Sequence, residues 1–199
     1  MSSKSKHTSL LLVEGDTEIE FYSYLADTKF PNIPKRIKNL HGNFSINNKI
    51  VDAALSFSQN NADNTFDVYV CVDQERIGSP PFNFNYVLSE LQKIKNFRIL
   101  NPVIAVLMIE SLFFIDIDGI YTFLRAKKTL RNPKKYANFR VLRHQELSKL
   151  FKTFGNNYSK GIKCQGFVQS LNIDKICGTS GEIASFIEKI HNKGKLKKT

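Results

Sequence analysis

The sequence predicts an α/β protein with a mostly parallel, four-stranded sheet flanked by helices. Short apolar segments alternate along the chain with longer segments whose apolar residues recur at helical spacing, which is the pattern of consecutive βαβ units. The first apolar segment, residues 9–13, is apolar throughout after Ser9, as expected of a strand buried on both faces of a parallel sheet. A chain of 199 residues, 42% hydrophobic and 24% charged, is long enough for one domain with a real core.

The four strands are expected at residues 9–13, 36–40, 66–72 and 97–107. The third is rich in β-branched residues, which favour strands. Pro102 interrupts the fourth strand. Because proline cannot donate to the strand ladder, we expect an edge position or a bulge there.

Helices are expected after each strand, at residues 18–25, 46–58, 84–94 and 108–124, and again at 182–191. In the first helix, Phe21, Tyr22 and Leu25 have helical spacing, and the other segments repeat this pattern with different apolar residues. The alternation of strands and helices indicates a Rossmann-like arrangement in which helices cover the sheet.

The chain is expected to form a single globular unit with two parts. Residues 1–124 form the core, and residues 125–199 form a basic, mainly helical extension packed on it. Residues 125–152 contain ten Lys or Arg and one acid, Glu146.

The net charge of +11 favours an acidic polymer as partner, and we expect nucleic acid. The residues expected to contact its phosphates are Lys127, Lys128, Arg131, Lys134, Lys135, Arg140 and Arg143. Tyr136 lies among them and could stack on an unpaired base. The alternative is a solvated helical face with ordinary core aromatics.

Cys71, Cys164 and Cys177 are widely spaced and give neither a disulfide framework nor a zinc pattern. Reduced thiols in a cytoplasmic protein are therefore expected. The N-terminus lacks a signal sequence, and no apolar run approaches the length of a membrane span, so we expect no membrane partner.

Acidic residues follow two of the buried strands. Glu14 comes directly after the first strand, and Asp73 and Glu75 come after the third. The carboxyl ends of parallel strands lie along one edge of the sheet, where ligands bind, so these three carboxylates converge if the two strands are neighbours. Like charges at close range repel unless a cation lies between them, and Mg²⁺ prefers carboxylate oxygens. The alternative, for each of these acids taken alone, is a structural role: a helix or turn cap for Asp73 or Glu75, and an ordinary turn for Glu14.

Three segments resemble a known family: residues 11–22, LLVEGDTEIEFY; residues 72–76, VDQER; and residues 104–114, IAVLMIESLFF. The first is similar to the VEGxTE opening, followed by FY, of TOPRIM domains. It is most like the compact type in OLD-family nucleases and small prokaryotic defence-associated nucleases. The second segment lies where that family has Asp-x-Asp, with Glu75 in place of the second Asp. The third is similar to a later element in which an acid precedes aromatic residues, with Phe113 in place of the usual Trp. The resemblance covers about residues 8–120.

The resemblance implies metal-dependent phosphodiester chemistry. Glu14 would be a metal ligand or general base, Asp73 and Glu75 would hold Mg²⁺ or Mn²⁺, and Glu110 would complete a second metal site. The alternative for Glu110 is a polar residue at a helix start. A lysine near such a site can neutralise charge on the reacting phosphate, and Lys160 is a candidate, although an exposed loop lysine is the simpler alternative. His41-Gly42 is a further candidate for a loop near the site.

The function predicted is a Mg²⁺-dependent endonuclease acting on DNA or RNA, with a role in prokaryotic antiviral defence that rests on the resemblance alone. Tyr22, Tyr69 and Tyr121 are present, but nothing marks one as a nucleophile, so hydrolysis is preferred. The alternative function is a non-catalytic or partner-activated nucleic-acid-binding subunit that works with a separate ATPase, since the chain has no GxxxxGK[ST] loop. The sequence leaves open whether the protein forms a homo-oligomer.

Overall fold

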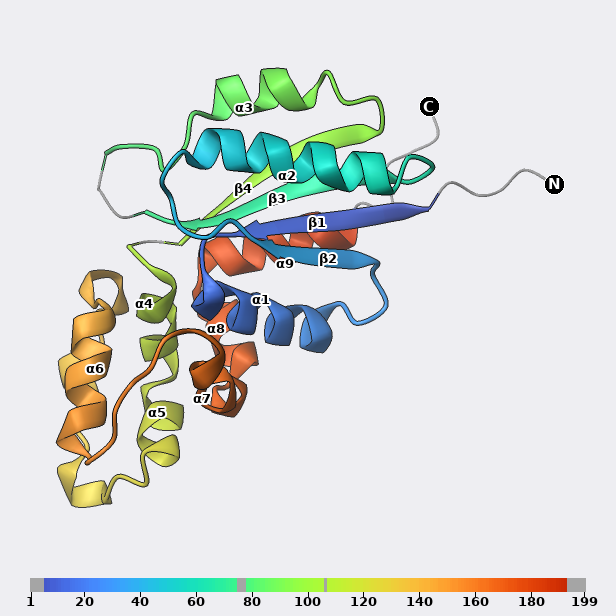
Figure 1. The fold of residues 1–199 in the computed structure, drawn as a ribbon. Coiled ribbons are helices and arrows are strands. Elements are labelled where there is room, and N and C mark those ends of the chain that lie inside the picture. The colour runs from blue at the N-terminus through green and yellow to red at the C-terminus, as the bar shows by residue number, and fades with distance from the viewer. Residues whose placement is uncertain (1–5, 75–77, 106, 193–199) are drawn as a thin grey trace.

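The structure is a computed structural model that describes residues 6–74, 78–105 and 107–192 (Figure 1). Four parallel strands form one sheet in the order β2-β1-β3-β4. Their bounds are β1 His7–Val13, β2 Lys35–Asn39, β3 Thr65–Asp73 and β4 Phe97–Ala105. The predicted α/β class and the parallel four-stranded sheet flanked by helices are confirmed.

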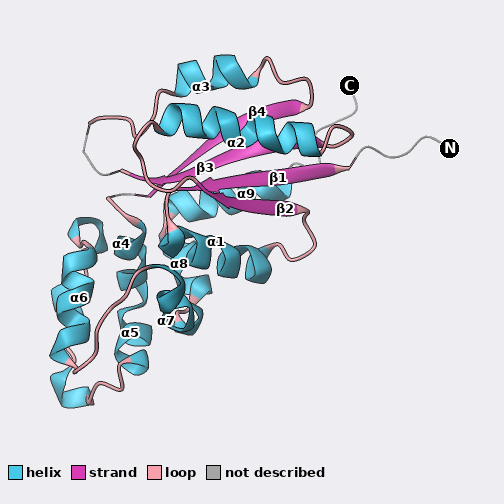
Figure 2. Ribbon diagram, in the orientation of Figure 1, coloured by secondary structure: helices cyan, strands magenta, loops and turns pink. Residues whose placement is uncertain are grey.

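The described helices surround and extend this sheet (Figure 2). The α-helices are α1 Asp16–Lys29, α2 Ile46–Asn60, α3 Phe84–Leu91, α4 Ile109–Phe113, α5 Ile117–Phe123, α6 His144–Thr153, α7 Gln165–Ser170, α8 Ile173–Thr179 and α9 Gly181–Asn192. The short 3₁₀ turns are η1 Phe114–Asp116, η2 Lys128–Leu130, η3 Pro133–Tyr136, η4 Phe139–Val141 and η5 Gly161–Cys164.

The sheet register brings the ends of β1 and β3 together. The two strands are neighbours, and Val13 pairs with Cys71, so the residues that follow each strand emerge side by side at the carboxyl edge. At the other side of β3, β4 is the edge strand, and Pro102 lies opposite Val70. The edge position predicted from Pro102 is confirmed.

Each face of the sheet carries its own apolar core, because successive strand side chains point to opposite faces. Leu10 and Leu12 of β1 join the core beneath α2 and α3, whereas Leu11 and Val13 join the core beneath α1 and α9. Figure 1 shows α2 and α3 on one face of the sheet, and α1 and α9 on the other. The sheet is therefore buried on both faces, as its apolar strands require.

Helix α9, near the end of the described chain, belongs to the sheet core. Phe186 is 1% exposed and makes edge-to-face contacts with Tyr22, Phe30 and Tyr69. These contacts join the first helix, the loop after it and the central strand β3 to the late part of the chain.

The helix predicted at residues 108–124 is divided into α4, η1 and α5. The division falls at Asp116, whose carboxylate accepts a hydrogen bond from the Asn172 backbone N–H at 2.8 Å and lies 3.5 Å from the Lys175 ammonium. That carboxylate also occupies the space beside Gly119, where a Cβ would lie 1.9 Å from Asp116 Oδ2. The Asp116 backbone, with φ −105° and ψ 55°, lies outside the helical region, which interrupts the helix at this residue.

No helix in the described part of the chain combines the length and apolarity needed to cross a membrane. Cys71, Cys164 and Cys177 are buried free thiols.

Candidate active site

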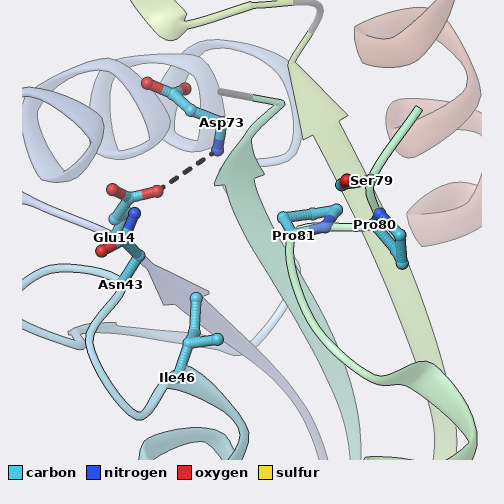
Figure 3. A pocket seen from close by; sticks show the side chains of 7 residues that line it. All are labelled: Glu14, Asn43, Ile46, Asp73, Ser79, Pro80 and Pro81. Atoms are coloured by element: carbon cyan, nitrogen blue, oxygen red, sulfur yellow. Dashed lines mark hydrogen bonds between the residues drawn. The ribbon is translucent and has the colours of Figure 1, made fainter. Parts of the chain in front are cut away.

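Glu14 and Asp73 meet at the carboxyl edge of the sheet (Figure 3). The Asp73 backbone N–H donates to Glu14 Oε2 at 3.4 Å, and both side chains are half-buried. The Glu14 carbonyl accepts a hydrogen bond from the Gly42 N–H at 2.8 Å. This bond holds the loop after β2 at the same edge of the sheet. The convergence expected of these two acids is present.

Asp73 also fixes the start of α4. Its Oδ1 atom accepts from the Ile109 backbone N–H at 2.9 Å, so the carboxylate that ends β3 satisfies the first turn of the helix that carries Glu110. Glu110 is 1% exposed. A fully buried carboxylate is costly unless it is paired, and this position therefore differs from an ordinary solvent-facing helix start.

The partners of Glu110 come from a segment late in the chain. Glu110 Oε1 lies 3.3 Å from the Lys160 ammonium and 3.3 Å from the Tyr158 hydroxyl, which donates to it. The Gly161 backbone N–H donates to Thr17 Oγ1 at 3.1 Å, and this bond holds the Lys160 loop against α1. Lys160 is therefore at the site, with its side chain 57% exposed and its ammonium in reach of a ligand.

Glu18 is a fourth carboxylate that the sequence reasoning did not assign. It lies in the first turn of α1 and is 8% exposed. Its carboxylate packs against Gly15, where a Cβ atom would lie only 3.0 Å from Glu18 Oε2. Burial, followed by the charges of Glu110 and Glu14, raises the pKa of Glu18 to about 7, although Lys160 opposes the shift. The signal in the sequence was a charged residue on the same helical face as Phe21 and Leu25.

Glu14, Glu18, Asp73 and Lys160 line one cleft of about 390 Å³ at the carboxyl edge, together with Gly15, Asp16, Thr17, Gly42, Met108 and Gly161. Burial, together with the charges of Glu18, Glu14 and Glu110, holds the pKa of Asp73 well above its usual range. The hydrogen bond from the Ile109 N–H lowers this pKa but does not cancel the shift. The ionised carboxylates thus repel one another, and Lys160 opposes this repulsion only in part. Gly42 lines the cleft, so the loop predicted at His41-Gly42 does approach the site.

The donor chemistry of the cleft fits a hard divalent cation, because carboxylate oxygens are the ligands that Mg²⁺ and Mn²⁺ prefer. Among residues 6–74, 78–105 and 107–192, no group of three His, Cys, Asp or Glu side chains is placed to hold a metal ion. Glu75, the other predicted ligand, lies outside the described residues. Mg²⁺ binds through one or two carboxylates and keeps several waters, so Glu14 and Asp73 satisfy its usual protein requirement.

A second pocket of about 160 Å³ shares Glu14 and Asp73 with the cleft. Its other lining residues are Asn43, Ile46, Ser79, Pro80 and Pro81. Figure 3 shows Ser79, Pro80 and Pro81 across the pocket from Glu14 and Asn43. Glu14 and Asp73 thus border a second pocket that is lined by both apolar and polar residues.

Most side chains of the predicted nucleic-acid surface are accessible. Those that are exposed are Lys127, Lys128, Lys134, Lys135, Arg140 and Arg143. Arg131 is half-buried and donates twice to the Ala126 carbonyl at 3.0 Å, so its guanidinium serves the local turn. Arg140 lies 3.4 Å from Glu182.

The base-stacking role considered for Tyr136 is wrong. Tyr136 is 8% exposed and its ring is stacked on Phe114 at 5.3 Å, with the ring planes 13° apart. Tyr22, Tyr69 and Tyr121 are also buried, each at most 1% exposed. Burial raises the pKa of Tyr22 well above its usual range, which makes this phenol a poor nucleophile.

Fold and site together define an α/β protein with an acidic cleft at the carboxyl edge of its parallel sheet. Comparison of the chain with protein-family models, with curated proteins and with solved structures finds no match. Functional inference therefore depends on the cleft itself.

Proposed function

We propose that the protein is a TOPRIM-like, divalent-metal-dependent endonuclease that hydrolyses DNA or RNA phosphodiesters. One observation carries the proposal: Glu14, Glu18 and Asp73, from two separate segments, line one cleft at the carboxyl edge of the sheet together with Lys160. The buried Glu110 lies 3.3 Å from the Lys160 ammonium. That edge is where open parallel sheets bind ligands. The basic residues after α5 and the net charge of +11 support a polyanionic substrate. The proposed role as an effector of prokaryotic defence depends on the TOPRIM resemblance.

In this mechanism Glu14 and Asp73 would hold Mg²⁺ or Mn²⁺, with Glu110 and Glu18 adding negative charge behind them. A bound divalent cation supplies Lewis acidity, which acidifies water and neutralises charge on a phosphodiester. The backbone N–H groups of Asp73 and Ile109 fix the carboxylates of Glu14 and Asp73 in place. Lys160, held by Glu110, presents an exposed ammonium that stabilises developing charge on the phosphate.

The test is cleavage of plasmid DNA and of total tRNA by purified protein in Mg²⁺, Mn²⁺ or EDTA. Glu14→Gln and Asp73→Asn should each lower the cleavage rate by roughly 100-fold or more, the loss typical of removing one preorganised electrostatic group. Asp73→Asn retains an oxygen acceptor for the Ile109 N–H, so its effect reports charge rather than fold. Glu188→Gln, an exposed carboxylate on α9, is the matched control. Undiminished cleavage by Asp73→Asn, or cleavage in EDTA, would contradict the proposal.

One observation favours a second candidate, a non-catalytic or partner-activated nucleic-acid-binding subunit working with a separate ATPase. Glu75 occupies the position where the family that the sequence resembles has Asp, and its extra methylene would hold a metal differently, as expected of a site that needs a partner or has lost activity. Co-purification with an ATPase that switches on metal-dependent cleavage would favour partner activation. Cleavage gained by Glu75→Asp, with no partner present, would favour a site that has lost activity.

A further inference from the structure

The pocket beside the acidic cleft has the dimensions and walls of a site for one flat ring. Its volume of about 160 Å³ is close to that of cavities that admit a single benzene ring, ~150 Å³. Ile46, Pro80 and Pro81 supply apolar walls, whereas Asn43 and Ser79 supply amide and hydroxyl groups. Because Glu14 and Asp73 form its remaining wall, a ring in this pocket would lie directly beside the carboxylates.

The loop on one side of the pocket is held in an unusual conformation. His41 and Ser45 have φ angles of 55° and 53° in the left-handed region, and Gly42 between them has a φ of 86°. Non-glycine residues in this region are held there by surrounding contacts and cluster at ligand sites. The contacts here are the Gly42 N–H bond to the Glu14 carbonyl and the Lys49 ammonium bonds to the His41 and Gly42 carbonyls at 2.8 and 3.1 Å.

This loop presents an exposed aromatic ring. Phe44, between Asn43 and the start of α2, is 84% exposed, the highest value among the exposed large apolar side chains described. From the same pocket a second hollow continues past Pro80 and Pro81 to Phe84, which is 38% exposed. Phe84 lines this second hollow, and Phe44 directly follows Asn43, which lines the pocket. Exposed aromatic rings beside a site for phosphodiesters are the groups on which unpaired bases stack.

We propose that the pocket receives one unpaired nucleobase next to the reacting phosphodiester, so that the substrate is single-stranded nucleic acid. The inference rests on the proposed function and specifies its substrate class. The base lies between Ile46 and Pro81, Asn43 and Ser79 hydrogen-bond its edge, and Phe44 stacks on the neighbouring base. A paired base cannot enter, because its faces are covered by its neighbours and it must leave the stack to reach such a pocket.

The chain has no tryptophan, so Phe44→Trp introduces a single tryptophan at the proposed stacking position. We expect its emission to be quenched when oligothymidylate or oligouridylate is added in EDTA. An abasic deoxyribose-phosphate oligomer of the same length should leave the emission unchanged, and so should duplex DNA. Leu55→Trp is the control, because Leu55 is 43% exposed on α2 and neither it nor its chain neighbours line the two hollows, and its emission should stay constant.

Fluorescence anisotropy of labelled oligonucleotides supplies the second readout. Phe44→Ala should weaken single-strand binding by roughly 5- to 100-fold, the range for loss of one base–aromatic stack, with abasic oligomer binding unchanged. Equal quenching by abasic and base-bearing oligomers, or no quenching while anisotropy reports binding, would overturn the inference. If Asp73→Asn abolishes cleavage but Asn43→Ala, in the pocket lining, and Phe44→Ala both bind and cleave like wild type, the proposed nuclease is supported and the proposed base pocket is wrong. Absence of both binding and cleavage in the wild type would overturn both.

Discussion

Glu18 is a carboxylate kept from water beside two other carboxylates, and its protonation is tied to folding. Its pKa is raised from 4.5 to about 7 by burial and by the charges of Glu110 and Glu14. In the unfolded chain the same group titrates near 4.5. Between these two pH values the folded protein therefore binds a proton that the unfolded chain has released.

The free energy of unfolding of the metal-free protein should therefore fall as pH rises from about 4.5 to 7. Stability is greatest below the unfolded pKa and is lost through the folded pKa, because the raised pKa favours the protonated folded state. Glu18→Gln mimics that neutral state. We expect it to match wild type at pH 4 and to exceed it at pH 8, by on the order of 3 kcal/mol.

Urea denaturation in EDTA across this pH range measures the effect. Glu188→Gln, which is outside the cleft, should follow the wild-type pH profile. Parallel pH profiles for wild type and Glu18→Gln would show that the Glu18 charge is not destabilising. A divalent cation should remove most of the difference at pH 8, since it neutralises the same excess charge.

The sequence was sufficient to predict those site residues that directly follow a strand whose apolar pattern is clear. Glu14 and Asp73 were found because they follow apolar strands, and strand ends define one edge of a parallel sheet. Glu18 was missed although it ends the VEGxTE segment, because it follows no strand and lies on the apolar face of a helix, where an acid is not expected to reach the cleft. Tyr158 could not be found, because it meets Glu110 across 48 positions of the chain, and no local pattern encodes that contact.

At the scale of elements, β3 and α4 are connected through one side chain. Asp73 accepts the hydrogen bond of the buried Ile109 N–H at the start of α4. Both its charge and its acceptor oxygen therefore affect stability, in opposite directions. The charge is destabilising at neutral pH because burial and the neighbouring acids raise its pKa, while the acceptor stabilises the helix start.

Substitutions at Asp73 separate these two effects. Asp73→Asn keeps the acceptor and removes the charge, so we expect a free energy of unfolding at pH 8 at or above that of wild type. Asp73→Ala leaves the Ile109 N–H without its acceptor and should be less stable than Asp73→Asn by about 1 to 3 kcal/mol. Chemical denaturation measures the free energy of unfolding of the wild type and the two variants. Equal stability of the Asn and Ala variants would show that the hydrogen bond from the Ile109 N–H to Asp73 contributes little.

The strands were easier to predict than the segment between α5 and α6. Apolar β-branched runs specify strands directly, and Pro102 correctly indicated an edge. By contrast, residues 125–143 form short 3₁₀ turns, held by contacts such as Arg131 to the Ala126 carbonyl and Tyr136 on Phe114. Their charges suggested a solvent-facing helix, and only the tertiary packing shows that Tyr136 is turned inward.

At the scale of the whole molecule, the sheet depends on a helix close to the end of the described chain. Phe186 of α9 is 1% exposed among Tyr22, Phe30 and Tyr69. Phe186→Ala should lower the free energy of unfolding by about 3–5 kcal/mol, the usual cost of a buried Phe→Ala change. The matched change Phe44→Ala, at a position 84% exposed, should stay within about 0.5 kcal/mol of wild type.

The same dependence predicts that residues 1–124 do not fold alone, because α1 would be left to cover one face of their sheet without α9. A fragment of these residues should lack a cooperative unfolding transition by circular dichroism. A folded, cooperative fragment would show that α9 is dispensable to the core.

The positive charge of the molecule should appear as a salt dependence of nucleic-acid binding. Replacing the exposed Lys127, Lys128, Lys134 and Lys135 by Gln should lower the slope of log Kd against log salt by about 0.7 for each phosphate of a single strand that the variant no longer neutralises. Lys93→Gln with Lys189→Gln, at exposed positions on other elements, is the control. An unchanged slope in the quadruple variant would mean that other residues bind the phosphates.

The bond between the Gly161 N–H and Thr17 Oγ1, with the contact of Lys160 to Glu110, also has a consequence for synthesis on the ribosome. Domains fold as their segments emerge from the N-terminus. The acids of the cleft all emerge before the lysine and tyrosine that complete it, and α9, which covers the sheet, emerges later still. A partly translated chain therefore cannot present the finished cleft to the nucleic acids that surround it during translation.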